Sequence, residues 1–598
     1  MTSDVEYLLL KEKGPYHEMY VRRRLNTSSS SCKFYTTVIV IISISLLVLL
    51  NSLIYVFVLV PSWQGQVLTY DGRKVSEALA HVLAHTQCGP VEGLLEEDVF
   101  VFKGIPYALP PEGSRRWQKP VGLNEKEGTC WKGTLQVKQF GSACVQPKDP
   151  NNHSSFTGSE DCLFLNVWTR SLDPLAKLPV MVWIHGGDLV FFSGNYPGYS
   201  PNPSVTKATG AVYVSMNYRL GPLGFLSLDV LSKESPSGTS GNYGLMDIIL
   251  VLQWVRDNIR NFGGDPSKVT VFGQSSGGTA IHALLASPLA VGLFHRAWAM
   301  SPSSILNKTS SQASRDNAIF LTRTGCDNAD CLRSLAPVKL MEGTPWSVFP
   351  YWGMEDLFSM PVKGHFDGAL PVVDGKVLME PPLQAWKSGR GIDVPLLLTT
   401  TAQEIDLMPF DPTISHWTWP HYRAIVKEQL TPFGTQVAQK ALELYPSSSR
   451  YSPEFQYTSL VTDIRATCPV HVLANVTSSH FRSPVYRGIV TASPSQPVNA
   501  FNISSARYAF HCWDAFTFFG DFGALGFQPQ TKDLDFQRML RQQVITFARD
   551  GRPESPVWQT YGTCTALISD HVFPEDHYNR DKCDFWLREG FFSYAWIN

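Results

Sequence analysis

A serine between glycines marks the stretch of this 598-residue sequence that is best suited to covalent chemistry. Residues 269–278 read Val-Thr-Val-Phe-Gly-Gln-Ser-Ser-Gly-Gly, a β-branched run typical of a buried strand followed by Gly-x-Ser-x-Gly around Ser275. A helix-compatible segment, Thr279–Ala286, follows at once. This order predicts a nucleophile elbow, because the glycines leave room for a sharp turn that presents the serine hydroxyl. The helix N-terminus would add partial positive charge beneath the hydroxyl, which makes Ser275 the candidate nucleophile.

The elements needed to hold such a turn are predicted on both sides of it. Strand-like runs occur at Leu178–Ile184, Ala211–Met216, Val269–Phe272 and Val394–Leu398, and a helix-like run occurs at Asp247–Ile259. Alternation of this kind predicts an α/β fold with a large, mostly parallel sheet and helices on both faces. The Ser- and Pro-rich residues 493–505 are predicted to form a surface loop.

The composition is that of a packed globular protein. Hydrophobic residues make up 44% of the chain, and 50 Lys and Arg nearly balance 52 Asp and Glu, for a net charge of -2. Since no overall positive field attracts polyanions, we expect no nucleic-acid partner.

An uncharged apolar segment near the N-terminus predicts a membrane anchor. No charged residue occurs from Phe34 to Tyr70, and residues 38–60 are almost entirely apolar, long enough for a helix to cross a bilayer. A cleaved signal peptide is the alternative, but it should be shorter and end in a small-residue cleavage site, which Pro61-Ser-Trp63 does not provide. Arg22-Arg-Arg24 precedes the segment, so the N-terminus is predicted to be cytoplasmic.

This orientation divides the chain into four predicted parts. A cytoplasmic tail (1–33) and a single-pass type II membrane span (34–60) are followed by a stalk (61–87) and an ectodomain (88–598) that is extracellular or lumenal. Of the 11 cysteines only Cys32 precedes the span, and the even set beyond it suits disulfide pairing in an oxidising compartment. Four sequons also lie on the outer side and are predicted glycosylation sites: Asn152, Asn307, Asn475 and Asn502.

Several motifs occur in the order seen in a known family. They are Ser159-Glu-Asp-Cys-Leu-Phe-Leu-Asn-Val-Trp168, Val182-Trp-Ile-His-Gly-Gly187, Asn217-Tyr-Arg-Leu-Gly-Pro-Leu-Gly-Phe225, Gly241-Asn-Tyr-Gly-Leu-Met-Asp247 and Asn261-Phe-Gly-Gly-Asp-Pro266. Together they resemble the type-B carboxylesterase/cholinesterase family of α/β-hydrolases, and the resemblance extends from about Cys88 to Trp586. It implies an α/β-hydrolase fold and a serine hydrolase that needs no metal and no organic cofactor.

The resemblance implies the two partners of Ser275. Glu404, which follows the apolar run 395–398, stands in the position of the family's acid. His511, which precedes an acidic and aromatic segment ending at Gly520, stands in the position of the base. The order Ser, Glu, His is that of the hydrolase fold. His511 would remove the proton of Ser275, while Glu404 would hold the imidazole tautomer and stabilise its positive form.

The turn that should bind the oxyanion departs from the family pattern. The resemblance implies backbone donors at Gly187, Asp188 and Ser276, each worth about 3 kcal/mol in such sites. The family has Gly-Gly-Gly or Gly-Gly-Ala in this turn, whereas the present chain has Asp188 in the third position. Its amide can still donate, but its carboxylate would oppose a developing negative charge. Asp188 is therefore the strongest sequence argument against ordinary esterase activity.

Two further departures concern Gln274, where Glu is common, and Cys512, where Gly is common. Cys512 either belongs to a disulfide, with Cys564 as its candidate partner, or crowds the base. The resemblance implies the disulfides Cys144–Cys162, Cys326–Cys331 and Cys468–Cys583. Cys88 and Cys130 are left as a remaining pair.

Two functions fit the sequence. The first is a membrane-anchored serine hydrolase acting on a small-molecule substrate, an uncharged carboxylic ester or thioester bound in an apolar pocket. A choline ester is disfavoured, because residues 151–158 lack the tryptophan that stacks on choline in cholinesterases. The second is a catalytically weak or inactive cell-surface adhesion or binding protein, similar to neurotactin or the neuroligins, with a protein partner or as a homodimer. Asp188 and the anchor favour it, whereas the complete set of Ser275, Glu404 and His511 opposes it.

Overall fold

The computed structural model describes residues 82–149, 152–345, 359–364, 371–408, 411–501 and 504–596. The chain divides into two compact units, Met1–Val75 and Ser76–Asn598, and the first lies outside the described residues. The predicted cytoplasmic tail, the predicted membrane span and residues 61–81 of the predicted stalk also lie outside the described residues. Within the described ranges, no helix is both long enough and apolar enough to cross a bilayer.

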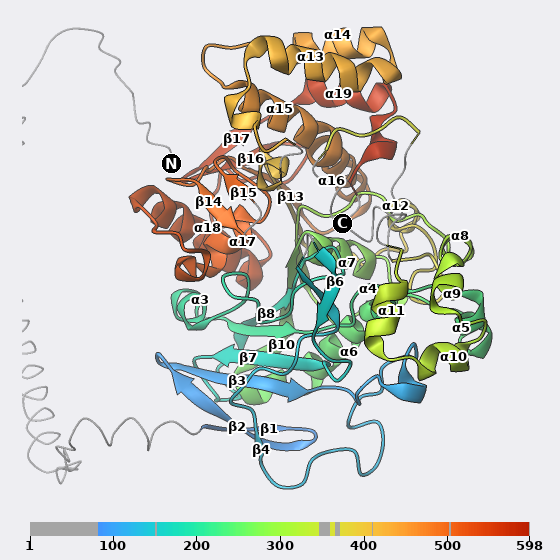
Figure 1. Cartoon of the computed structure of the whole chain (residues 1–598). Helices are drawn as coiled ribbons and strands as arrows, with labels where there is room; N and C mark the ends of the chain where they lie inside the picture. Colours follow the sequence, from blue (N-terminus) through green and yellow to red (C-terminus); the bar gives the residue numbers. More distant parts are fainter. Residues whose placement is uncertain are drawn as a thin grey trace, which may run out of the picture. The chain divides into compact units, whose positions relative to one another are not determined.

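The second unit is built around one large sheet, which has 13 strands in the described part of the chain (Figure 1). The strand order is β1-β2-β3-β7-β9-β8-β10-β11-β12-β13-β16-β17, with β4 beside β2. The strands are β1 (Val82–Thr86), β2 (Gly89–Glu96), β3 (Val99–Pro106), β4 (Leu135–Gln136), β7 (Phe164–Thr169), β8 (Leu178–Ile184), β9 (Val212–Met216), β10 (Gly264–Gln274), β11 (Arg296–Met300), β12 (Leu396–Thr401), β13 (Val485–Val490), β16 (Thr565–Ile568) and β17 (Val572–Glu575). All neighbours from β9 to β16 are parallel, and the outer pairs along the order are antiparallel. The predicted mostly parallel sheet is confirmed.

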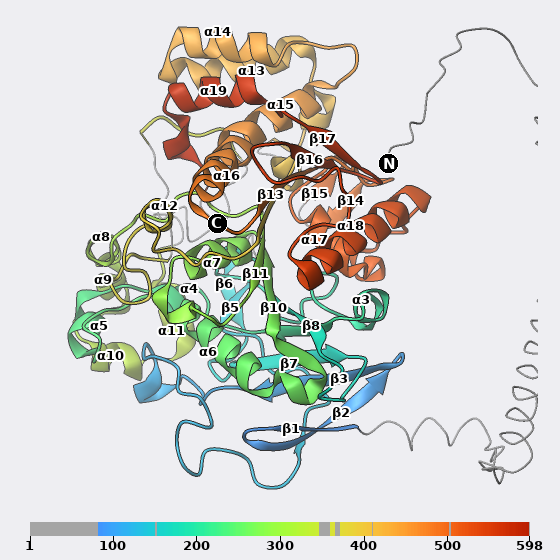
Figure 2. The same ribbon diagram turned by 180° about the vertical axis from the view of Figure 1, so that it is seen from behind.

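Helices cover both faces of this sheet. The helices are α3 (Pro203–Thr209), α4 (Gly221–Phe225), α5 (Asp229–Glu234), α6 (Tyr243–Asn258), α7 (Ser276–Leu284), α8 (Ser310–Asp316), α9 (Ile319–Thr324), α10 (Ala329–Ser334), α11 (Pro337–Gly343), α12 (Pro382–Lys387), α13 (Trp419–Leu430), α14 (Thr435–Leu444), α15 (Pro453–Thr462), α16 (Cys468–His480), α17 (Trp513–Phe519), α18 (Thr531–Asp550) and α19 (Arg580–Arg588). In both views α3, α17 and α18 lie on one side of the central strands, whereas α6, α7 and α16 lie on the other (Figure 1 and Figure 2). The α/β architecture is therefore the predicted one.

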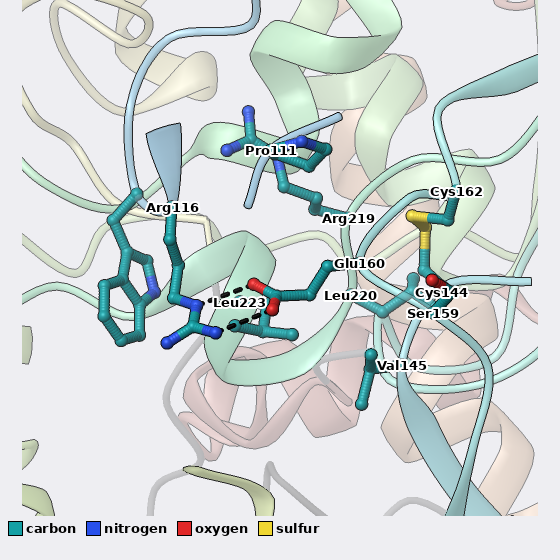
Figure 3. Close-up of a pocket in the computed structure, with 11 residues that line it drawn as sticks. Pro111, Arg116, Cys144, Val145, Ser159, Glu160, Cys162, Arg219, Leu220 and Leu223 are labelled. Carbon is teal, nitrogen blue, oxygen red and sulfur yellow. Dashed lines mark hydrogen bonds and ion pairs between the residues drawn. A yellow bond between two sulfur atoms is a disulfide. The ribbon is translucent and has the colours of Figure 1, made fainter. Parts of the chain in front are cut away.

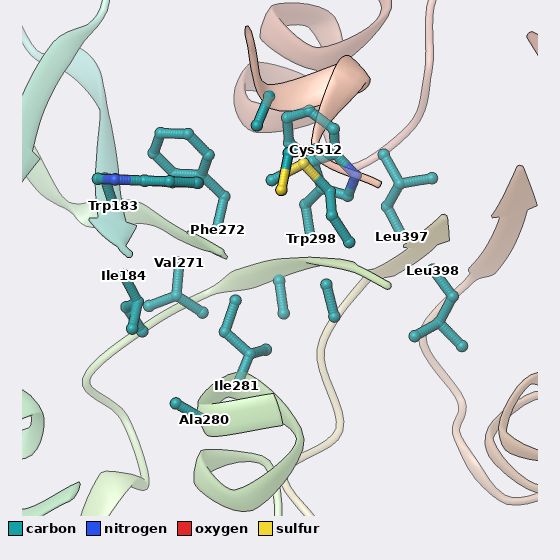
Figure 4. Packing of buried hydrophobic residues seen from close by; sticks show 14 of the residues in the cluster. Trp183, Ile184, Val271, Phe272, Ala280, Ile281, Trp298, Leu397, Leu398 and Cys512 are labelled. Carbon is teal, nitrogen blue, oxygen red and sulfur yellow. The ribbon is translucent and has the colours of Figure 1, made fainter. Parts of the chain in front are cut away.

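The central strands are apolar on both sides because both sides are covered. Val271 and Phe272 of β10 are fully buried and, as neighbours in a strand, point to opposite faces. Figure 4 shows Val271 on the side of Ile281 from α7, and Phe272 on the opposite side near Trp183. The ring centroids of Phe272 and Trp183 are 5.0 Å apart. This packing fixes the carboxyl end of β10, where the candidate nucleophile follows.

Two segments predicted to be irregular contain strands. Residues 82–86, assigned to the stalk, form β1, which pairs with β2 and buries Ala84. The folded domain therefore begins before residue 88. Residues 493–505, predicted to be a loop, contain β14 (Val498–Ala500) and the start of β15 (Ser504–Ala506), which pair as a hairpin. Strands of three to five residues were missed because so short an alternation of buried and exposed positions carries little signal.

Four disulfides are present in the described ranges, and they include the three pairs implied by the family resemblance. The bonds are Cys88–Cys130, Cys144–Cys162, Cys326–Cys331 and Cys468–Cys583. Cys512 and Cys564 are free and buried, so the candidate bond between them was wrong. Each thiol has its own partner, since Cys512 Sγ donates to Gln274 Oε1 at 3.1 Å and Cys564 Sγ donates to the Val557 carbonyl at 3.5 Å.

Candidate active site

Ser275 lies at the turn between β10 and α7, with φ of 60° and ψ of -129°. This backbone conformation strains a residue other than glycine by about 1–3 kcal/mol and persists only where its surroundings enforce it. The Ser275 amide donates to the Met300 carbonyl of β11 at 2.9 Å, and the Thr279 amide of α7 donates to the Ser275 carbonyl at 2.9 Å. The geometry is that of the predicted nucleophile elbow.

Gly277 explains why the elbow needs its glycines. A Cβ at this position would lie 2.1 Å from the Ile184 carbonyl oxygen and 2.9 Å from the His185 carbonyl oxygen. Any side chain would therefore collide with the backbone that follows β8. Gly277 allows α7 to start directly against the strand that leads to the predicted oxyanion turn.

Glu404 and His511 meet beside this elbow, although 107 positions separate them in the sequence. Glu404 begins a short 3₁₀ helix, η7 (Glu404–Leu407), in the loop after β12, and His511 lies in the loop before α17. His511 Nδ1 is 2.6 Å from Glu404 Oε2, and both side chains are buried. The other carboxylate oxygen, Oε1, accepts hydrogen bonds from Ser301 Oγ at 2.6 Å and from the Thr401 amide at 2.8 Å. The carboxylate is thus oriented to accept the Nδ1 proton, which leaves Nε2 as the basic nitrogen.

Gln274 links the elbow to the imidazole. Its Nε2 lies 3.1 Å from Nε2 and 3.3 Å from Nδ1 of His511, so the amide nitrogen lies over the face of the ring. Its Oε1 accepts hydrogen bonds from the Tyr199 hydroxyl and from Cys512 Sγ. Burial raises the pKa of the Cys512 thiol, which keeps it a neutral donor. The two departures from the family pattern, Gln274 and Cys512, are therefore direct partners at the base.

Sequence reasoning missed Ser301, which holds Glu404. Its position carries a signal, since it directly follows β11, and polar residues at the carboxyl ends of parallel strands gather at one edge of the sheet. Sequence reasoning also missed Trp596, whose ring lies 4.8 Å from that of His511. No local signal identifies Trp596, because an isolated tryptophan far along the chain is typical of ordinary core packing.

The turn after β8 packs against the elbow. A Cβ at Gly186 would lie 3.0 Å from the Cβ of Ser275, so turn and nucleophile are in direct contact. The Leu189 amide donates to Ser276 Oγ at 3.1 Å, which ties the turn to the first residue of α7. The predicted oxyanion donors after β8 are thereby brought to the side of Ser275.

Asp188 keeps the left-handed backbone that this turn requires. The φ angles are 102° at Gly187, 57° at Asp188 and 56° at Leu189. Asp188 is 4% exposed, so its carboxylate is withdrawn from bulk water. A buried negative charge in this turn acts at high strength on any charge that develops nearby. Asp188 is therefore buried in the turn predicted to bind the oxyanion, where a negative charge would oppose ester hydrolysis.

Asp514, three residues after His511, is another carboxyl group buried near the site. Burial raises the pKa of its carboxyl to about 7, and the negative charge of Glu404 adds to the rise. An unfolded aspartate has a pKa of about 3.9. Between about pH 4 and pH 7 the folded protein therefore holds a proton that the unfolded chain has released, and stability falls as the pH rises through this window.

We predict that Asp514→Asn removes this pH dependence. A shift of about three pKa units corresponds to at most about 4 kcal/mol, so the variant should gain stability relative to the native protein near pH 7.5 and much less near pH 5. Thermal unfolding at both pH values measures the effect. Asp521→Asn, at an exposed position in the following loop, is the matched control and should leave the native pH dependence in place. An Asp514→Asn protein with that same dependence would contradict the prediction.

The motif around Ser159 serves the structure and not the chemistry. Glu160 is buried and accepts two hydrogen bonds of 2.6 Å from the guanidinium of Arg116. Arg116 Nη1 also donates to three backbone carbonyls, those of Leu332, Arg333 and Leu335. Figure 3 shows this pair near the Cys144–Cys162 disulfide. The cavity between them has a volume of about 10 Å³, room for about one water, so it accepts no substrate.

The structure describes the side chains of two of the four predicted glycosylation sites. Asn307 and Asn475 are exposed and accessible to modification. Asn502 and the side chain of Asn152 lie outside the described residues. In the described ranges, no group of three or more His, Cys, Asp or Glu side chains is arranged to hold a metal ion.

Comparisons with known proteins agree with this geometry. Residues 80–586 match the carboxylesterase family. The chain is 33% identical over 495 residues to para-nitrobenzyl esterase of Bacillus subtilis (strain 168). The aligned region covers 81% of this chain and 93% of the esterase. It is also 33% identical over 536 residues to neurotactin of Drosophila melanogaster. This aligned region covers 87% of this chain and 60% of neurotactin. A solved structure of a para-nitrobenzyl esterase has a TM-score of 0.68 at 31% identity and covers 85% of this chain and 99% of that chain. The chain therefore belongs to the carboxylesterase family, a family of carboxylic ester hydrolases with the α/β-hydrolase fold.

Proposed function

We propose that this chain is a membrane-anchored serine hydrolase that cleaves carboxylic esters through an acyl-enzyme intermediate on Ser275. The observation that carries the proposal is the buried hydrogen-bonded pair of His511 and Glu404 beside a strained serine at a strand-to-helix turn. The family match and the similarity to para-nitrobenzyl esterase support the same reaction class.

The proposed reaction uses each group at a stated atom. His511 Nε2 takes the hydroxyl proton as Ser275 Oγ attacks the ester carbonyl carbon. The resulting oxyanion accepts hydrogen bonds from the amides of Gly187, Asp188 and Ser276. The bond to the alcohol oxygen then breaks, and the alcohol leaves with the proton from His511. Water attacks the acyl-enzyme with the same proton transfers and releases the acid, while Glu404 stabilises the imidazolium formed in each half.

The surroundings of the oxyanion turn support an uncharged, apolar substrate group. A Cβ at Gly187 would lie 2.7 Å from the ring of Phe192, so this ring borders the turn. Phe192 stacks on Phe501 with centroids 4.7 Å apart and contacts Tyr196 at 4.4 Å. Such a cluster favours an apolar ester or thioester of a small acid.

The test uses the purified full-length protein in detergent. Short acyl esters should be hydrolysed, with acid release followed by titration at constant pH. A fluorophosphonate should label Ser275, located by peptide mass spectrometry, and Ser275→Ala should show neither labelling nor turnover. Absence of both hydrolysis and labelling in the native protein would reject the proposal.

A second proposed function is adhesion or binding at the cell surface, with a protein partner or a second copy. The similarity to neurotactin over 87% of this chain and the burial of Asp188 in the oxyanion turn favour it. The complete geometry of Glu404 and His511 opposes it, because binding alone gives no reason to keep an imidazole aligned on a carboxylate. A cell-aggregation assay with no partner-dependent adhesion, alongside robust esterase activity, would dismiss this function.

We also propose that residues 34–60 anchor the chain as a single-pass type II protein, with the folded unit outside the cell or in a lumen. The basic run Arg22–Arg24 before the apolar segment supports this orientation, and the four disulfides support an oxidising compartment. In intact cells that carry the protein at their surface, an N-terminal tag should be protected and a C-terminal tag digested by added protease. The reverse pattern would refute the orientation.

A further inference from the structure

The segment after α19 returns to the imidazole of His511. The rings of Trp596 and His511 have centroids 4.8 Å apart at an interplanar angle of 77°, an edge-to-face contact. Both side chains are buried, Trp596 at 1% exposed and His511 at 3%. A bulky side chain from a remote segment thus lies directly against the proposed base.

Specific contacts hold this segment in place. It begins with the 3₁₀ helix η12 (Phe591–Tyr594), whose first ring packs on Trp586 of α19 with centroids 4.9 Å apart. The Trp596 amide donates to the Arg465 carbonyl at 2.9 Å, and Arg465 Nη1 donates to the Tyr594 carbonyl at 2.9 Å. Arg465 lies in the π-helical turn that joins α15 to α16, and α19 lies beside these helices (Figure 1). One backbone hydrogen bond at Trp596 and one from the Arg465 side chain to Tyr594 thus hold this segment against the site.

The position of Trp596 matters because of what the imidazole must reach. In the proposed reaction His511 gives its proton to the oxygen of the departing alcohol, so the alcohol must lie next to the ring. Glu404 occupies the Nδ1 side of the ring, and Gln274 lies over it. Trp596 takes further space around the same ring, and Ser275 is only 8% exposed. A side chain that has no part in the bond changes therefore lies against the ring that must reach the leaving alcohol.

We propose that Trp596 is a specificity-determining residue that limits the size of the alcohol half of the substrate. The inference rests on the proposed hydrolase function and extends it, because the limit on size acts on the leaving alcohol and not on the acyl chain. The native protein should prefer esters of small alcohols, and removal of the indole should relax that preference.

The test compares Trp596→Ala with the native full-length protein on two ester series. In the first series the acid is butyrate and the alcohol grows from methyl to benzyl to naphthylmethyl. In the second the alcohol is methyl and the acid grows from acetate to octanoate. We expect kcat/KM for the largest alcohols to rise about tenfold or more in the variant, with methyl butyrate changed less than threefold and the acyl series changed uniformly. A gain confined to long acyl chains, or no gain in either series, would overturn the proposal.

Two further variants separate specificity from damage to the fold. Trp596→Leu keeps an apolar side chain and should give a smaller gain in the same direction, so the test stands even where the alanine variant is unstable. Phe592→Ala removes a half-buried ring from the same 3₁₀ helix and should leave the alcohol preference unchanged. Fluorophosphonate labelling and methyl butyrate turnover by the native protein report on the hydrolase function itself. If both are present but the alcohol series is flat, only the role of Trp596 fails.

Discussion

Replacing Glu404 by glutamine should lower kcat for ester hydrolysis by about 10⁴-fold, as amide-for-carboxylate exchange does in comparable triads. Glu404 Oε1 accepts a hydrogen bond from the Thr401 amide, a donor that cannot reverse its role. The glutamine oxygen must therefore take that position, and the amide nitrogen then faces His511 Nδ1. The imidazole must present a lone pair at Nδ1 and carry its proton on Nε2. In that tautomer Nε2 cannot accept the proton of Ser275.

Steady-state kinetics on a small ester measures this loss, and thermal unfolding should show that the variant is folded. Asp406→Asn is the matched control, because Asp406 lies in the same 3₁₀ helix and is also buried. Its Oδ2 accepts from the amides of Arg507 and Tyr508, and an asparagine oxygen can accept from both. Its turnover should stay within a few-fold of the native value. A Glu404→Gln enzyme within tenfold of native activity would contradict the assigned role of Glu404.

The parts of the fold that could be predicted from the sequence are those with strong local patterns. The apolar run of β10 and the Gly-x-Ser-x-Gly after it identify a buried strand and a tight turn, because periodicity and glycine placement act over few residues. Leu178–Ile184 was predicted with the bounds that β8 has in the structure. The short strands β1 and β14 were missed, since a few alternating residues resemble many loops.

The candidate site depends on contacts between residues that are distant in the sequence, and only some of these could be predicted. Glu404 and His511 could be named only because their positions match a family pattern, and the structure brings their side chains together. The contact of Gln274 with Cys512 and the contact of Trp596 with His511 could not be foreseen. Both join segments that are distant in the sequence, and no local pattern determines which distant side chains pack together. Such contacts decide how the base is surrounded, and therefore which substrates reach it.

Replacing Asp188 by glycine should raise kcat for small esters by about 100-fold with little change in KM. At an effective dielectric constant of about 20, a unit negative charge about 5 Å from a developing oxyanion raises the free energy of the transition state by about 3 kcal/mol. A change of about 3 kcal/mol in the barrier corresponds to roughly 100-fold in rate. The repulsion arises only in the transition state, so it acts on kcat and not on substrate binding. Glycine also suits the φ of 57° at this position, so the substitution should not disturb the turn.

Asp188→Asn separates charge from shape, because it removes the carboxylate and keeps a side chain of nearly the same size. If the charge limits turnover, asparagine should recover most of the gain seen with glycine; if bulk limits it, glycine alone should do so. Affinity for a trifluoromethyl ketone, whose adduct carries the same oxyanion, should tighten in parallel with kcat. Unchanged kcat and unchanged affinity in both variants would show that the carboxylate is directed away from the oxyanion. The limit on small-ester turnover would then lie in other buried surroundings of Ser275 and His511, and not in the charge of Asp188.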